Sequence, residues 1–298
     1  MNNRYNLTYS IVLSIIMLLA GTIPATAAES KDIEERVLPA AGITSFEAES
    51  IEGSFKVVSH GNDEVQLTIT RVVKGVSQEQ AEKVLAALKT VFKAEGDSIY
   101  LQEDHPGNRK EWKEATGLND VEFEILYELR MPASIHQAIR TVEGDVMLAK
   151  MSGKIGITTV EGDVLVEQAG GQVGVKTTEG DVLIKQVAGF ARVSSVEGDV
   201  MIRDSSGFQV QSVEGDVLVD LSGEPAGNCS LNTVQGDATL SLSPDLAVNI
   251  VAQSLSGEVK LKLSLDDLVR TRGQVVGARN GGGVSIQLNS VRGDIILK

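Results

Sequence analysis

The residues whose types and spacing could do chemistry are the acids of a repeated Glu-Gly-Asp tripeptide. It begins at five positions spaced 18, 18, 18 and 17 residues apart: Glu143, Glu161, Glu179, Glu197 and Glu214. Stacked carboxylates could bind calcium, which takes several oxygen ligands, or supply the acid pair of a glycoside hydrolase. The Gly-Gly-x-Gly-x-Asp pattern of calcium-binding rolls is absent. We therefore expect the Asp residues to cap turns by accepting backbone N–H groups, with cation binding as the alternative.

The elements that position these acids repeat with the same period. A second glycine follows each of the first four motif glycines by nine residues, at Gly153, Gly171, Gly189 and Gly207. A nine-residue half can hold one strand of about five residues and a turn, but no helix. Degenerate motifs with glycines at Gly236, Gly257 and Gly293 continue the series, and we interpret the last gap of 36 residues as two coils. The sequence predicts a mainly β protein, a single-stranded parallel β-solenoid of about 18-residue coils.

Period-two alternation within these strands separates a core face from an outer face. Pairs such as Val164/Val166 and Val173/Val175 should point inward as aliphatic ladders. Between the inward residues of the first sheet lie five large apolar residues, here called the Met/Leu ladder: Met147, Leu165, Leu183, Met201 and Leu218. So many stacked apolar side chains need a cover or a partner. They are the candidate binding surface, unless another part of the chain covers them.

The outer face of the second sheet has a different composition. Its outward pairs are Lys154/Gly156, Gln172/Gly174, Phe190/Arg192 and Gln209/Gln211. We expect this face to be largely solvated.

The chain before the repeats is less regular. Residues 28–135 should form a β-rich region interrupted by one amphipathic helix at about 77–94, which Ser77 and Gln80 begin as a capping box. This helix should cover either a solenoid end or the Met/Leu ladder. The polar segment 102–120 around Trp112 should be an exposed loop. The predicted organisation is a signal peptide at 1–27, the β-rich region at 28–135 and the solenoid at 136–298.

The first 27 residues are typical of a secretory signal peptide. Arg4 precedes an apolar stretch from Ile11 to Ala20, and Ala25-Thr26-Ala27 fits a cleavage site. The stretch is shorter than the roughly 20 residues that span a bilayer, so we expect no membrane span after cleavage. The predicted location is the periplasm, the cell surface or the medium. A formal charge of -14 argues against nucleic acid as a partner. Three His and one Cys make a His- or Cys-based metal site improbable.

Residues of about 40–298 resemble a known bacterial group. An apolar-Pro step, Leu129-Arg130-Met131-Pro132, leads from a strand-rich part into tandem Gly-Asp repeats. This arrangement is similar to the putative-adhesin family of exported β-strand-repeat proteins, a domain of unknown function. The resemblance implies a solenoid fold without established catalytic residues or cofactors, and a role in the cell envelope.

The expected function is therefore a non-enzymatic, envelope-associated, adhesin-like binding scaffold. Its partner would be another envelope protein, a glycan or a second copy of the chain. The alternatives are a polysaccharide-active β-helix enzyme and a self-assembling envelope fibre. The enzyme would need a converged acid and base, which periodic carboxylates do not by themselves provide.

Overall fold

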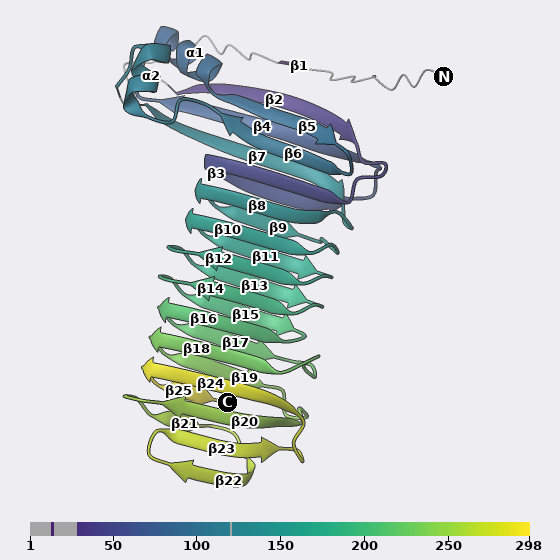
Figure 1. Cartoon of the computed structure of the whole chain (residues 1–298), viewed down its shortest axis with the longest axis vertical. Coiled ribbons are helices and arrows are strands. Elements are labelled where there is room, and N and C mark those ends of the chain that lie inside the picture. The colour runs from purple at the N-terminus through teal and green to yellow at the C-terminus, as the bar shows by residue number, and fades with distance from the viewer. Residues whose placement is uncertain (1–12, 15–28, 120) are drawn as a thin grey trace.

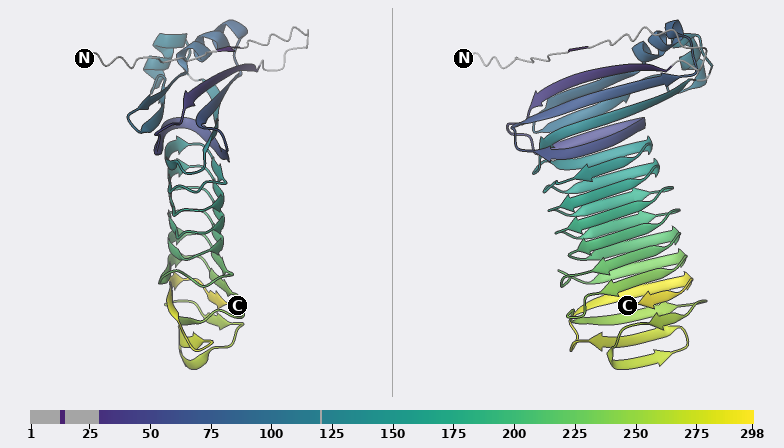
Figure 2. Two further views of the ribbon diagram at one scale, coloured as in Figure 1. Left: turned by 90° about the vertical axis from the view of Figure 1, so that its right-hand side faces the viewer. Right: turned by 180° about the vertical axis from the view of Figure 1, so that it is seen from behind.

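The computed structural model describes residues 13–14, 29–119 and 121–298, and the predicted signal peptide lies almost wholly outside them. The protein is mainly β, with two long, mostly parallel sheets that face each other along a tall stack (Figures 1 and 2). We call them sheet A and sheet B. Their inner faces supply the core, and their outer faces are open.

The N-terminal elements comprise seven strands and two short helices. Their bounds are β1 (Leu13–Ser14), β2 (Ser30–Pro39), β3 (Ser45–His60), β4 (Glu64–Lys74), α1 (Gln78–Ala87), β5 (Lys89–Glu95), β6 (Ser98–Asp104), α2 (Arg109–Thr116) and β7 (Glu122–Pro132).

The repeats follow, with strands that alternate between the two sheets. Sheet B receives β8 (His136–Glu143), β10 (Ile155–Glu161), β12 (Val173–Thr177), β14 (Ala191–Ser195), β16 (Phe208–Glu214) and β18 (Cys229–Gln235). Sheet A receives β9 (Val146–Ala149), β11 (Val164–Ala169), β13 (Val182–Val187), β15 (Val200–Ser205), β17 (Val217–Leu221) and β19 (Ala238–Leu242). The last six strands are β20 (Val248–Ser254), β21 (Val259–Leu261), β22 (Asp266–Thr271), β23 (Gln274–Arg279), β24 (Val284–Arg292) and β25 (Ile295–Leu297).

Parallel pairing aligns equivalent residues of successive repeats. Val164 pairs with Val182 in sheet A, and Val173 pairs with Ala191 in sheet B, each across 18 residues. The predicted inward residues are buried in both sheets, except that Leu261 at the last sheet-A edge is half-buried. Each coil therefore adds aliphatic side chains to a continuous core, which its neighbours complete.

The motif glycines form one corner of the stack, where both their backbone angle and their close packing require glycine. Seven of them have φ between 112° and 140°. A Cβ on Gly180 would lie 2.3 Å from the carbonyl oxygen of Gly162 in the preceding coil. In the second glycine ladder, close packing alone requires glycine at three of the four positions, Gly153, Gly171 and Gly189. Gly171, for example, lacks a positive φ, but its Cβ would meet Gly153 O at 2.3 Å.

The N-terminal region caps the stack by extending both sheets. The long strand β3 bends at Gly53, pairs with β8 in sheet B and with β9 in sheet A, and so forms a first coil. Beyond it, sheet A continues through β7, β4 and β2, while sheet B continues through β6 and β5. Glu52-Gly53 has the same two residues that begin the motif and lies at the corner of this first coil, with Glu52 paired to Glu143.

The predicted helix is shorter than expected, and the region contains a second helix, α2. The capping box of Ser77 and Gln80 begins α1, but the helix ends at Ala87. The following Thr90-Val91-Phe92 stretch instead joins β5, because β-branched and aromatic residues pair well with the neighbouring β6. Helix α1 packs beside α2, β4 and β2 at the end of the stack (Figure 1). It covers the N-terminal end of the stack and leaves the Met/Leu ladder open.

The segment predicted as a loop at 102–120 contains the end of β6 and helix α2. The Asn108 side chain caps the backbone N–H groups of Lys110 and Glu111, and Gly117 ends the helix with φ 81°. Two turns are too few to show a clear helical period in the sequence, but the caps were visible.

The C-terminal end departs from the predicted order of coils. The 36-residue gap before Gly293 is not two further coils. Strands β22 and β23 pair antiparallel below β20. The final coil of β24 and β25 then inserts between the coils of β18/β19 and β20/β21 (Figure 1). Gly293 consequently packs on Gly236, and Gly257 packs on Gly293.

Among the described residues, no helix has the length and apolar character needed to cross a bilayer.

Candidate binding faces

The Met/Leu ladder forms one column on the outer face of sheet A. Leu165 pairs with Met147 and Leu183, and Met201 pairs with Leu183 and Leu218. Met147 is 41% exposed, and the other four are half-buried by their stacked neighbours. None of the helices or strands described packs across this column. The predicted assembly of these five residues is therefore real, although their role in binding remains a prediction.

Charged residues bound the ladder on three sides. Lys56 lies above Met147 and pairs with Glu128 at 2.8 Å. Beside the ladder, Glu167 pairs with Lys185 at 3.1 Å and Arg203 with Asp220 at 3.5 Å; the Asp residues of the corner lie on the other side. An apolar strip with a charged rim is the usual anatomy of a protein-binding surface.

The Asp residues of the motif hold neighbouring coils together. One carboxylate oxygen of Asp163 accepts the backbone N–H of Asp181 at 2.8 Å, and that of Asp181 accepts the N–H of Asp199 at 2.8 Å. The chain of bonds continues through Asp216 and Asp237 to Asp294, in the spatial order of the coils. The turn-capping prediction is confirmed, with the donor supplied by the next coil. These bonds offset the repulsion of about 1 kcal/mol between stacked carboxylates.

Substitution of Asp181 separates the hydrogen bond from the charge. Asp181→Ala leaves the amide of Asp199 without its acceptor and should lower the free energy of unfolding by about 1 kcal/mol. Asp181→Asn keeps an acceptor oxygen and removes one like charge from the ladder, so it should be neutral within about 0.5 kcal/mol. Urea denaturation of the two variants checks this difference. Equal losses would mean that the charge, not the bond, matters.

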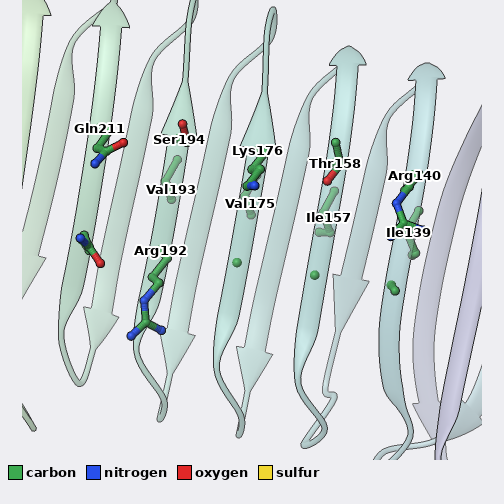
Figure 3. A pocket seen from close by; sticks show the side chains of 14 residues that line it. Ile139, Arg140, Ile157, Thr158, Val175, Lys176, Arg192, Val193, Ser194 and Gln211 are labelled. Atoms are coloured by element: carbon green, nitrogen blue, oxygen red, sulfur yellow. The ribbon is translucent and has the colours of Figure 1, made fainter.

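The outer face of sheet B contains a shallow trough rather than an even solvated surface. Ala138, Gly156 and Gly174 form its floor, where neighbouring strands lack long side chains. Figure 3 shows Arg140, Thr158, Lys176, Ser194 and Gln211 along one side, with Arg192 beyond the glycine floor. The hollow has a volume of about 440 Å³. It arises only because small residues coincide on successive coils.

A second exposed apolar column was missed at the sequence level. We call it the Val ladder. It stands at the end of sheet B, directly before the motif glutamates, and comprises Ile51, Val142, Val160, Val196, Val213, Val234 and Val291, each 39–45% exposed. Thr178 occupies the same position in the one remaining coil of this stretch. The signal was present as the apolar residue of a Val-Glu-Gly-Asp pattern.

A buried ionic cluster lies where the N-terminal cap meets the first coil. The Glu103 and His105 side chains, 2% and 3% exposed, are 3.2 Å apart. His105 Nδ1 also faces the carbonyl oxygen of Pro106 at 2.9 Å, so both ring nitrogens meet acceptors, an arrangement that favours the imidazolium over the neutral ring. Trp112 and Phe123 pack against the imidazole. Trp112 is thus a packing residue.

Hydrogen bonds explain the charge states of this cluster. Burial raises the pKa of Glu103, but bonds from His105, Ser50 and two backbone amides outweigh it and leave the pKa below its usual range. The bond to Glu103 raises the pKa of His105 against the opposing effect of burial. Ser50 donates its hydroxyl to the Glu103 carboxylate and not to the imidazole, so the three side chains lack the Ser–His–acid order of a catalytic triad. The cluster locks the corner of β3; it is not a catalytic triad.

The described residues contain no group of three or more His, Cys, Asp or Glu side chains arranged to hold a metal ion.

Two facing parallel sheets with stacked corners define a repetitive β scaffold of the toastrack type. Residues 168–298 match the family described as Toastrack DUF4097. The predicted resemblance to the putative-adhesin family is thereby confirmed.

The solved structures that match this chain have low identity to it. A putative adhesin from Bacteroides fragilis is 13% identical, with 89% of this chain and 97% of that chain covered and a TM-score of 0.48. A putative cell adhesion protein from Clostridium sporogenes is 12% identical, with coverage of 91% and 99% and a TM-score of 0.28. A putative lipid binding protein from Parabacteroides distasonis is 10% identical, with coverage of 88% and 96% and a TM-score of 0.34. No curated protein matches the chain.

Proposed function

We propose that this protein is an exported, non-enzymatic, adhesin-like scaffold of the bacterial envelope that docks another envelope protein on the Met/Leu ladder. The observation that supports this most directly is a column of five large apolar side chains that none of the described elements covers. Contiguous exposed apolar surface of this kind is typical of interaction sites. Export follows from the signal peptide predicted at 1–27.

The carboxylates of the repeat favour a structural role over catalysis. The Asp residues accept amide hydrogens from neighbouring coils, and the motif glutamates stack one per coil without converging. Two partly buried carboxyl groups among the residues described have altered pKa values. Glu103 is enclosed by its own hydrogen bonds, and the pKa of Glu52, at the corner of the first coil, is raised by burial and by the neighbouring Glu143. General acid–base chemistry needs a group that can reach a substrate.

Site-specific photo-crosslinking in the native host tests the docking face. A photoreactive residue at Leu183 should capture one defined envelope protein, whereas the same residue at Gln287, on the outer face of sheet B, should not. Leu183 is half-buried on an outer face, so the probe should leave the fold intact. Crosslinks confined to this chain, or an identical product from both positions, would contradict the proposal.

A further inference from the structure

We propose a second interaction surface, independent of the Met/Leu ladder: the trough on sheet B receives the acidic corner of a second copy of this chain. The corner consists of the Val ladder and the motif glutamates that follow it. Both surfaces repeat once per coil. The corner of one chain presents acidic and apolar side chains, and the trough of the other presents cations beside a glycine floor.

The trough supplies cations in an otherwise acidic protein. The chain has a formal charge of -14, yet Arg140, Lys176 and Arg192 all line this one hollow. In the part of the chain that the structure describes, Lys176 and Arg192 have no carboxylate oxygen within 4.0 Å of their charged nitrogens. Arg140 forms an ion pair with Glu49, with 3.3 Å between nitrogen and oxygen. Arg192 lies over the Phe190 ring at 4.8 Å, which holds it beside the floor. The trough therefore suits an acidic, partly apolar object.

The corner supplies that object. The motif glutamates are exposed, and within the described residues their carboxylates accept no hydrogen bond, unlike the neighbouring Asp side chains. The Val ladder beside them exposes about two-fifths of each side chain. An acidic row with an apolar row next to it matches a trough with a cationic side and a glycine floor.

Spacing makes the match extend over several coils at once. The trough and the corner have the same repeat of about 4.8 Å per coil. Alignment of Lys176 with the partner's Glu179 therefore also brings Arg192 close to the partner's Glu197. Since trough and corner lie on the same side of the stack, a two-fold contact can engage both pairs of surfaces reciprocally.

The expected association is weak and salt-dependent. The trough spans five coils, from β8 to β16, so it is about 20 Å long at this spacing. A contact of that size belongs to the small, transient class. Its charges are exposed, so high salt should weaken it.

Charge exchange tests this contact, because two reversed surfaces complement each other again. Lys176→Glu/Arg192→Glu reverses the trough, and Glu179→Lys/Glu197→Lys reverses the corner. All four side chains are exposed, so the variants should fold. Sedimentation velocity at physiological salt should show dimers for the wild type and monomers for each variant alone. An equimolar mixture of the two variants should regain dimers, because each reversed surface then meets its complement. Lys110→Glu/Lys113→Glu on α2 makes the same charge change elsewhere and should dimerise like the wild type.

Two results would overturn the proposal. One is a wild type that remains monomeric at concentrations up to about 1 mM, the weak end of measurable association. The other is a mixture of the two variants that stays monomeric. If the wild type is monomeric but binds sodium polygalacturonate through Lys176 and Arg192, the trough is a site for acidic glycans and the self-docking proposal is wrong.

Discussion

Replacing Gly180 with alanine should lower the free energy of unfolding by at least about 3 kcal/mol, one of the two largest effects expected in this chain. The residue has φ 118°, which disfavours any Cβ. The added Cβ would also lie 2.3 Å from Gly162 O, a backbone atom fixed by the hydrogen bonds between coils. The coils of Gly162 and Gly180 cannot move apart to make room for this Cβ without disturbing the hydrogen bonds that link successive coils.

Two control variants divide this cost into its parts. Gly42 has φ 80°, but a Cβ added there would have no neighbouring atom within 4 Å, so Gly42→Ala measures the backbone term alone. Gly223 has neither constraint, and Gly223→Ala should change stability by less than about 0.5 kcal/mol. Urea denaturation of the three variants supplies the comparison. Similar stabilities for Gly180→Ala and Gly223→Ala would show that the coils do not pack as closely as described.

Removing the carboxylate of the buried pair should have a comparable effect that depends on pH. Glu103→Gln leaves the His105 imidazolium without its counter-ion and should cost about 3 kcal/mol at mildly acidic pH. At alkaline pH the imidazole is neutral in the wild type as well, so the cost should be smaller. Glu122→Gln, at an exposed position, is the matched control.

The direction of the two pKa shifts defines the pH window. The pKa of His105 is raised from 6.5, so its contribution is complete below about pH 6.5 and is lost as the pH rises through the folded-state pKa. The pKa of Glu103 is lowered from 4.5, so its contribution is present above about pH 4.5 and is lost on acidification through the folded-state pKa. The pair should stabilise the cap most between these values. A difference between wild type and Glu103→Gln that does not change from about pH 5.5 to 8 would rule out the charged pair.

Much of the stack could be predicted because its information is local and repeated. Period-two alternation assigns Val164 and Leu165 to opposite faces, and the 18-residue period aligns Leu165 with Leu183. The hydrogen bonds accepted by the motif Asp residues could be predicted from the tendency of Asp to accept amide hydrogens beside turn glycines. These properties require no knowledge of distant contacts.

The features that were missed depend on spatial order or on the absence of side chains. The insertion of β24 between β18 and β20 cannot be derived from spacing, because a 36-residue gap fits two ordinary coils equally well. The trough exists because Gly156 and Gly174 are paired on neighbouring strands. Alternation along each strand assigns both residues to the outer face, but it does not show that the missing side chains line up to form a hollow. The Glu103–His105 pair joins β6 to the corner of β3, about 50 residues away in the chain.

The most direct test of the proposed function compares the envelope assemblies of the wild type and a ladder variant by sedimentation of native extracts. Leu183→Lys/Met201→Lys places two charges in the middle of the Met/Leu ladder, and Gln253→Lys/Gln287→Lys adds the same charge to the outer face of sheet B away from the trough. We expect the wild type and the sheet-B variant to sediment together with the envelope protein crosslinked from Leu183, and the folded ladder variant to sediment without it. Cosedimentation of that protein with the ladder variant, unchanged from the wild type, would contradict the assignment of the Met/Leu ladder as the docking face.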